Sequence, residues 1–286
     1  MQLMDGSKVA KEMLIEIEQE VSALKDHHIH PKLAVILVGN DPASLAYIRQ
    51  KQKACSETGI EWEQFDYAEE VSTEELIEKI EELNTADTVH GILIQLPLPK
   101  QVFVPDVIRA IAPKKDVDGF TAYNLGKMML STDFEHLAPC TPRGVIKLLE
   151  YYNVEIQGKE VVVVGHSNIV GKPLSLMLLN RNATVTTCHV YTKDLASHTK
   201  RADILCVAVG KPGLISADMV KEGSVVIDIG INRTDSGKLV GDTNFEEISK
   251  KVEFITPVPG GVGPMTVACL MDNTLTAAKR LNGIET

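Results

Sequence analysis

The stretch EVVVVGHSNIVGKP, residues 160–173, decides the fold of the larger part of the chain. Its four consecutive valines predict a strand buried on both faces, and Gly165 opens a turn into a helix that begins near Gly171. In a doubly wound sheet this turn holds a pyrophosphate, because glycine lets the backbone approach and the helix N-terminus offers N–H groups. The spacing is GxSxxxG rather than GxGxxG, so the motif alone also fits an ordinary turn.

Alternating β-rich and helical segments surround this motif and predict two α/β domains. The second domain, Rossmann-like and doubly wound with a parallel sheet, is expected over residues 140–258 and binds a dinucleotide. The first, an α/β catalytic domain, is expected over residues 1–119 plus 266–286, with a cleft between the two. Strands are expected at 32–38, 60–67, 89–95, 160–165, 183–189, 202–210, 224–230 and 253–258, and helices at 7–25, 42–58, 73–84, 104–112, 171–182 and 266–281.

The charge balance excludes several classes of partner. The 286 residues include 29 Lys plus Arg and 39 Asp plus Glu, a net charge of −10, and no run of five basic residues. A nucleic-acid surface or a polybasic membrane contact is therefore not expected. Ten carboxylates and one lysine between Glu61 and Glu82 carry −9 of this charge. That segment is predicted to be a solvated strand and helix, the helix opening on a capping box at Ser72.

The five cysteines form no CxxC pair, so no metal site is expected. Apolar runs stay short of the ~18 residues of a membrane span, and the N-terminus lacks a basic region followed by an apolar one. We therefore expect a cytoplasmic protein without membrane contact.

Candidate catalytic residues gather where strands of the first domain end. Asp41-Pro42 predicts the start of a helix that carries Ser44, Tyr47 and Lys51 on one face. A lone lysine on a helix is usually solvated. However, the strand 89–95 delivers Gln95, and the turn KKDVDGF at 114–120 presents Asp118. Ligands of open α/β sheets bind beyond the carboxyl ends of strands, where these residues are expected to lie.

Two further segments leave alternatives open. The loop TPVPGGVGPMT, residues 256–266, is either a stiff connection or a cradle of backbone N–H groups for an anion. The corner Cys188-His189-Val190-Tyr191, where the adenosine ribose is expected, carries neither a carboxylate nor an arginine. These residues therefore do not indicate whether the cofactor is NAD or NADP.

Together, the motifs SLAYIRQK, HGILIQLPLP, KDVDGF, GHSNIVGKP and TPVPGGVGPMT resemble the bifunctional methylenetetrahydrofolate dehydrogenase/methenyltetrahydrofolate cyclohydrolase family, in the family's order and over essentially the whole chain. The resemblance implies oxidation of 5,10-methylenetetrahydrofolate by a nicotinamide cofactor. Hydrolysis of the methenyl product to 10-formyltetrahydrofolate follows. It also implies a homodimer built through the nucleotide domain.

The resemblance implies roles position by position. Lys51 would handle protons in the hydrolytic step, with Gln95 holding it. Asp118 would bind the aminopyrimidinone edge of the pterin. Tyr47 would stack on the pterin, with Ser44 on the same helix face, and the loop containing Pro259, Gly260 and Gly261 would close over folate and nicotinamide. The cofactor contacts implied are Gly165, His166, Ser167, Val190 and Ile231.

Two of these positions depart from the family pattern. NADP-using members generally carry Arg where this chain has His166 and Ser where it has Val190, and both serve the 2′-phosphate. NADP is the cofactor that the family implies, and NAD is an alternative because these two groups are replaced.

Two other functions fit the same fold. One is a non-catalytic regulator that binds folate or nucleotide. The joint presence of Lys51, Gln95 and Asp118 argues against it. The other is a different NAD(P)-dependent α/β dehydrogenase, which would want an arginine clamp for a substrate carboxylate, and none is evident.

Overall fold

The computed structural model describes residues 1–234 and 236–284, and they form two compact units. The three-stranded unit contains Lys11–Lys127, Asp133–Cys140 and Val267–Thr286. The six-stranded unit contains Met1–Ala10, Met128–Thr132 and Thr141–Thr266.

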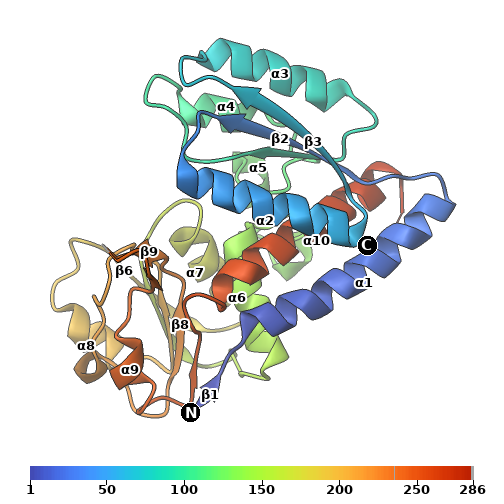
Figure 1. The fold of residues 1–286 in the computed structure, drawn as a ribbon. Coiled ribbons are helices and arrows are strands. Elements are labelled where there is room, and N and C mark those ends of the chain that lie inside the picture. Colours follow the sequence, from blue (N-terminus) through green and yellow to red (C-terminus); the bar gives the residue numbers. More distant parts are fainter. Residues whose placement is uncertain (235, 285–286) are drawn as a thin grey trace. The chain divides into compact units, whose positions relative to one another are not determined.

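The sheet of the three-stranded unit is entirely parallel, in the order β3-β2-β4. Figure 1 shows α3 and α4 on one side of this sheet and α2 on the other. The elements found mainly in this unit are α1 (Gly6–Asp26), β2 (Lys32–Val38), α2 (Pro42–Thr58), β3 (Glu61–Tyr67), α3 (Thr73–Thr85), β4 (Gly91–Ile94), α4 (Val104–Ala110), α5 (Ala122–Lys127), the 3₁₀ turn Thr132–Phe134 and α10 (Val262–Leu281).

The central strand β2 separates two hydrophobic cores. Its residues Leu33, Val35 and Leu37 pack into a core with apolar side chains of α1, α2 and α10. The alternate residues, Ala34 and Ile36 among them, pack into a second core with side chains of α3 and α4. Because successive side chains of a strand point to opposite faces, a strand covered on both faces must be apolar at every position.

The acidic segment folds as its pattern predicts. The capping box is present, since the Ser72 side chain accepts a hydrogen bond from the Glu75 backbone N–H and Glu75 accepts from the Ser72 N–H. The helix α3 buries Leu76, Ile80 and Leu83, so most of its carboxylates remain on the solvated face.

The six-stranded unit holds a second parallel sheet, in the order β1-β11-β8-β7-β5-β6. Strand β5 pairs with β6 on one side and with β7 on the other, so the strand order reverses there. The elements of this unit are β1 (Gln2–Leu3), α6 (Cys140–Tyr151, with Cys140 at the boundary), β5 (Glu160–Val164), α7 (Gly171–Asn180), β6 (Thr184–Cys188), α8 (Leu195–Thr199), β7 (Ile204–Val207), a 3₁₀ turn (Ala217–Met219), β8 (Val225–Asp228), β9 (Asn232–Arg233), β10 (Leu239–Val240), α9 (Phe245–Ile248) and β11 (Phe254–Ile255).

Two α/β units with parallel sheets confirm the predicted fold class. The helix α6 was not predicted, because its first turn contains Pro142 and Gly144, which read as part of a turn. The strand expected at 202–210 is shorter, Ile204–Val207, because the backbone after it turns away to other partners. Among the described residues, no helix combines the length and the apolar character needed to cross a bilayer.

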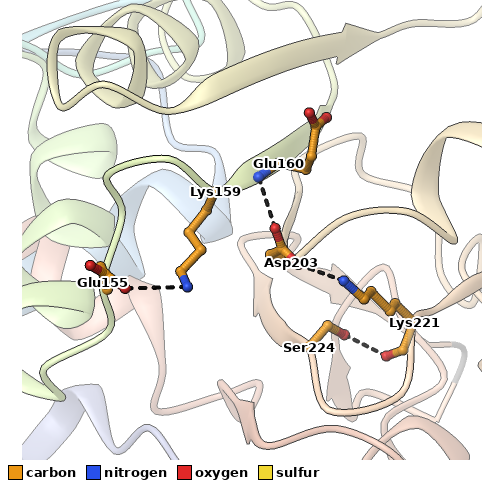
Figure 2. Close-up of polar contacts among 6 residues, drawn as sticks. All are labelled: Glu155, Lys159, Glu160, Asp203, Lys221 and Ser224. Carbon is orange, nitrogen blue, oxygen red and sulfur yellow. Dashed lines mark hydrogen bonds and ion pairs between the residues drawn. The ribbon is translucent and has the colours of Figure 1, made fainter.

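The amino-terminal ends of three strands in the six-stranded unit are tied by one carboxylate (Figure 2). Asp203, immediately before β7, accepts a hydrogen bond from the Lys221 ammonium at 2.6 Å and from the Glu160 backbone N–H at 2.9 Å. The Ser224 hydroxyl, before β8, donates to the Lys221 carbonyl at 2.7 Å. The bond from Lys221, with that from Glu160, lowers the pKa of Asp203.

Replacement of Asp203 by asparagine is expected to destabilise the six-stranded unit by about 1 kcal/mol at pH 7, because a charge-assisted bond is lost at a half-exposed site. A lowered native pKa stabilises the fold above the unfolded value of about 4 and loses that effect as the pH falls through the native value. The difference in melting temperature between wild type and Asp203→Asn should therefore shrink from pH 7 to pH 3. Glu155→Gln, which removes the exposed pair with Lys159, is the control and should change little.

Candidate active site

A buried lysine lies at the centre of the site in the three-stranded unit. Asp41 caps α2, with its carboxylate accepting from the Ser44 N–H at 2.7 Å, and this helix carries Lys51 inward. Lys51 is only 9% exposed, and its Nζ donates to Oε1 of Gln95 at 2.9 Å. The structure thus brings these two sequence-predicted residues together.

The side chain of Gln95 is fixed in one orientation. Gln95 follows β4, and its backbone N–H donates to the carbonyl of Ile36 at 2.9 Å, which continues the pairing with β2. Its Nε2 donates to the carbonyl of Leu96 at 2.7 Å. Because the amide nitrogen is engaged there, the amide oxygen faces Lys51 and holds the ammonium by a neutral acceptor.

Asp118 belongs to the same electrostatic environment. Burial raises the pKa of Asp118 to about 6; the positive charge of Lys51 opposes this shift, Asp116 adds to it, and a hydrogen bond from Cys140 opposes it. A small hollow beside Asp118 is lined by Ile92, Ile94 and Phe120 among others. A carboxyl group with this pKa changes its charge close to neutral pH.

The loop that presents Asp118 is anchored by a residue that the sequence analysis did not identify. Nδ2 of the buried Asn273, on α10, donates to the carbonyls of Val117 at 2.8 Å and Ala138 at 2.9 Å. Gly119 has φ of +71°, and a Cβ there would lie 2.5 Å from the carbonyl oxygen of Leu137. Asn273 stands between Asp272 and Thr274 in the chain, so no signal in the sequence indicated that this amide is buried.

The neighbouring polar residues of KKDVDGF are structural. Asp116 accepts from the backbone N–H groups of Phe120 and Thr121 and from Nδ2 of Asn124. Lys115 is buried and its Nζ donates to the carbonyls of Leu83 and Ala86, at the C-terminal end of α3. Only Asp118 of this turn therefore has the charge and setting of a ligand-binding group.

Ser44 and Tyr47 lie on α2, two turns and one turn before Lys51 respectively. The Ser44 hydroxyl donates to Asp41 at 2.9 Å and is 4% exposed, so it completes the helix cap in this structure. Tyr47 is half-buried, and burial raises the pKa of its hydroxyl. The predicted contacts of both residues with substrate stay predictions.

In the six-stranded unit, the turn after β5 is shaped by two close backbone approaches. Gly165 has φ of +120°, and a Cβ there would lie 2.2 Å from the carbonyl oxygen of Ala208, after β7. A Cβ on Gly171 would lie 2.0 Å from the carbonyl oxygen of Gly165. The turn therefore lies at the point where the strand order reverses, which is where open α/β sheets bind their ligands.

The other predicted cofactor residues are all exposed. Ser167 Oγ accepts from the Val170 N–H at 3.1 Å and from the Gly171 N–H at 3.4 Å at the start of α7. The imidazole of His166 lies 5.0 Å from that of His189, measured between ring centroids. Val190 is 83% exposed and Ile231 is 43% exposed, so both side chains are open to a ligand.

The proline- and glycine-rich loop is pinned to the start of α1. The Ser7 N–H donates to the carbonyl of Gly260 at 3.0 Å, and Gly260 has φ of +103°. A Cβ on Gly6 would lie 1.8 Å from the carbonyl oxygen of Gly261. The peptide bond before Pro259 is cis. This loop is therefore a defined structure, whose predicted contact with ligands stays a prediction.

These features define a class of protein: a two-unit α/β protein with a dinucleotide-type turn in one parallel sheet and a buried, amide-held lysine beside the other. The sequence matches the family "Tetrahydrofolate dehydrogenase/cyclohydrolase, catalytic domain" over residues 4–118. It matches "Tetrahydrofolate dehydrogenase/cyclohydrolase, NAD(P)-binding domain" over residues 139–282.

Individual proteins agree with these matches. A curated relative named "Bifunctional protein FolD" from Nautilia profundicola is 52% identical, over 98% of each chain. The bifunctional FolD methylenetetrahydrofolate dehydrogenase/cyclohydrolase of Campylobacter jejuni has a solved structure that is 48% identical, with a TM-score of 0.95 over 98% of this chain and 99% of the other. The FolD structure of Trypanosoma brucei, solved with NADP and an inhibitor, is 37% identical, with a TM-score of 0.94 over 98% and 97% of the two chains.

The chain belongs to the tetrahydrofolate dehydrogenase/cyclohydrolase family. The resemblance stated from the sequence motifs is therefore confirmed, together with the fold of a catalytic and an NAD(P)-binding domain.

Substitution of Asp118 by asparagine is expected to raise stability at pH 8. The native pKa of about 6 lies above the unfolded value near 4, so the folded protein holds this proton more tightly and its stability falls as the pH rises from 4 to 7. The uncharged asparagine avoids the cost of a buried carboxylate, about 1–2 kcal/mol at pH 8.

Melting temperatures of wild type and Asp118→Asn at pH 4.5 and pH 8 test this. The variant should gain over wild type only at the higher pH, and a loss of stability at pH 8 would contradict the assignment. Glu78→Gln, on the exposed face of α3, is the control and should behave as wild type at both values.

Proposed function

We propose that Lys51 and Gln95 carry out the hydrolytic step, and Asp118 the binding step, of a bifunctional enzyme. It oxidises 5,10-methylenetetrahydrofolate with NADP and hydrolyses the methenyl product to 10-formyltetrahydrofolate. The observation that carries this proposal is the 2.9 Å hydrogen bond between the buried ammonium and an amide oxygen of fixed orientation.

Asp118 is proposed to bind the pterin. A carboxylate accepts two parallel hydrogen bonds from neighbouring N–H groups, as it does from arginine. The aminopyrimidinone edge of a pterin offers such a pair. Tyr47 is proposed to stack on the ring, because its half-buried side chain precedes Lys51 by one turn of the same helix.

Hydrolysis of a methenyl group needs two proton movements. The water that adds to the carbon between N5 and N10 gives up both of its protons. One passes to N5 as the bond between N5 and that carbon breaks, and the other is released as the water oxygen becomes the formyl oxygen. An ammonium has three N–H donors, of which one is directed to Gln95. Lys51 is proposed to exchange the proton through Nζ, while Gln95 keeps Nζ in place during both movements.

The six-stranded unit is proposed to hold the dinucleotide. Gly165 and Ser167 would receive the pyrophosphate at the α7 N-terminus, and the turn fits such a group because Gly165 has φ of +120° and α7 begins directly after the turn. The side chains of His166 and Val190 would face the ribose and its phosphate, and Ile231 the nicotinamide. When bound, the nicotinamide accepts a hydride from the one-carbon unit of the folate.

Folate binding is proposed for residues 1–119 plus 266–286, and dinucleotide binding for residues 140–258. The loop residues Pro259, Gly260 and Gly261 and the cap residue Ser44 are proposed as further substrate contacts. We also propose a cytoplasmic homodimer assembled through the six-stranded unit. Support for this assembly comes from β6, a strand at the edge of the sheet, and from Leu179 on α7, which is 56% exposed.

Lys51→Met is expected to reduce cyclohydrolase activity at least a hundredfold, because methionine keeps the apolar stem but cannot carry a proton. Lys53→Met is the matched control, since Lys53 lies on the same helix with its side chain 77% exposed, and it should retain activity. The measurement is the decay of methenyltetrahydrofolate absorbance. Full retention of hydrolysis in Lys51→Met would refute the role.

His166→Arg is expected to raise the ratio of kcat/KM for NADP over NAD about tenfold, because a guanidinium is permanently charged and pairs a phosphate with two hydrogen bonds. The ratio is measured from initial rates with each cofactor, before and after substitution. His198→Arg, on α8, serves as a control for added charge. An unchanged ratio in His166→Arg would place the 2′-phosphate elsewhere.

A further inference from the structure

Two buried aspartates lie next to each other in the six-stranded unit, outside the residues assigned above. Asp228 ends β8 and is 3% exposed, and Asp242 follows β10 and is 0% exposed. The backbone N–H of Asp242 donates to Asp228 Oδ1 at 2.9 Å. The carboxylate of Asp228 also accepts from the backbone of Gly230 and from both the N–H and the hydroxyl of Thr243.

The carboxylate of Asp242 gathers donors from two separate loops. Its Oδ2 accepts from the Val209 N–H at 2.7 Å and the Gly210 N–H at 3.0 Å. Its Oδ1 accepts from the Lys211 N–H at 2.8 Å and from Nδ2 of Asn232 at 2.8 Å. One buried side chain therefore satisfies the three backbone N–H groups that follow β7 and also binds the residue that opens β9.

Glycines make this arrangement possible. A Cβ on Gly230 would lie 2.2 Å from Cγ of Asp242, and a Cβ on Gly241 would lie 2.0 Å from Oδ2 of Asp228. Any larger residue would push a carboxylate away from its donors. Each carboxylate is thus enclosed by backbone, with four donors of its own.

The segments bound by Asp242, residues 209–211 and Asn232, follow the carboxyl ends of β7 and β8, on the side of the sheet where the turn after β5 also lies. Val209 follows Ala208, whose carbonyl oxygen limits Gly165 to a residue without a Cβ. Ile231 immediately precedes Asn232. Val209 and Ile231 are 37% and 43% exposed, so two apolar side chains are open to solvent; the Val209 N–H and the side chain of Asn232, next to Ile231, bind the same carboxylate.

We infer that Asp242 is a positioning residue of the dehydrogenase reaction, which holds the backbone N–H of Val209 and the side-chain amide of Asn232 so that Val209 and Ile231 form an apolar contact for the dinucleotide. The inference rests on the proposed placement of the dinucleotide at Ile231. Asp242 itself touches neither ligand. It acts on cofactor binding and hydride transfer and leaves the hydrolytic step, which uses no cofactor, unchanged.

Asp242→Asn tests the inference, because asparagine keeps the shape of aspartate but replaces one accepting oxygen by an NH₂ group, which cannot accept a hydrogen bond from a backbone N–H. Its dissociation constant for NADP, from fluorescence titration, should rise at least tenfold, and dehydrogenase kcat/KM should fall to match. Cyclohydrolase activity should stay within twofold of wild type. Asn232→Ala is a milder variant, because it removes one side-chain donor and leaves every backbone N–H group paired with Asp242. It should raise the dissociation constant for NADP about threefold to fivefold, and it keeps the test available if Asp242→Asn does not fold.

Asp203→Asn is the matched control. It removes a carboxylate that also binds a backbone N–H and a side chain, but at the amino-terminal ends of the strands, whereas Asp242 binds residues beyond their carboxyl ends (Figure 2). It should lower the melting temperature without changing NADP binding. An equal rise of the NADP dissociation constant in Asp203→Asn would show that Asp242 only stabilises the fold, and it would overturn the inference. An unchanged constant in Asp242→Asn, or in Asn232→Ala if Asp242→Asn does not fold, would do the same.

Ile231→Ala separates this inference from the proposed function. If Ile231→Ala weakens NADP binding and the Asp242 and Asn232 variants do not, only the positioning role fails. If Ile231→Ala leaves NADP binding unchanged, the placement of the dinucleotide fails, and the inference fails with it.

Discussion

The catalytic unit depends on a lysine that is buried against a neutral amide. Removing an ammonium from water is costly unless it is hydrogen-bonded, and Lys51 donates such a bond to Gln95. A carboxylate in place of Gln95 would form an ion pair with the ammonium. An amide accepts the same hydrogen bond without a charge, so the ammonium is held in one place without an ion pair.

This pairing explains why the surrounding backbone is so fully anchored. Gln95 can face Lys51 only because its nitrogen binds the carbonyl of Leu96 and its backbone extends the pairing of β4 with β2. Asn273 holds the carbonyls of Val117 and Ala138 beside Asp118, whose pKa is raised by burial. The chemistry of the site is therefore set by hydrogen bonds to main-chain atoms rather than by the reactive side chains alone.

The sequence predicted the parts of this arrangement that are local. The apolar run of β2, the cap at Asp41 and the helix spacing that carries Lys51 are each determined within a few residues, and they were found from the pattern. The family resemblance paired Lys51 with Gln95. The anchors were not found, because Asn273 and Asp242 act on residues far away in the chain. Nothing in their own neighbourhood distinguishes them from solvated polar residues.

The net charge of −10 takes on a different meaning once the anchors are known. Most carboxylates of the acidic segment lie on a solvated face, where they contribute to solubility. Asp116 and Asp242, which are almost fully buried, each accept several N–H groups from the loops that follow parallel strands. A loop beyond a strand end has N–H groups without sheet partners, and an acidic side chain satisfies several of them at once. Both units therefore hold a loop on an internal carboxylate, and the position of each acid in the fold, rather than the total charge, determines which groups it binds.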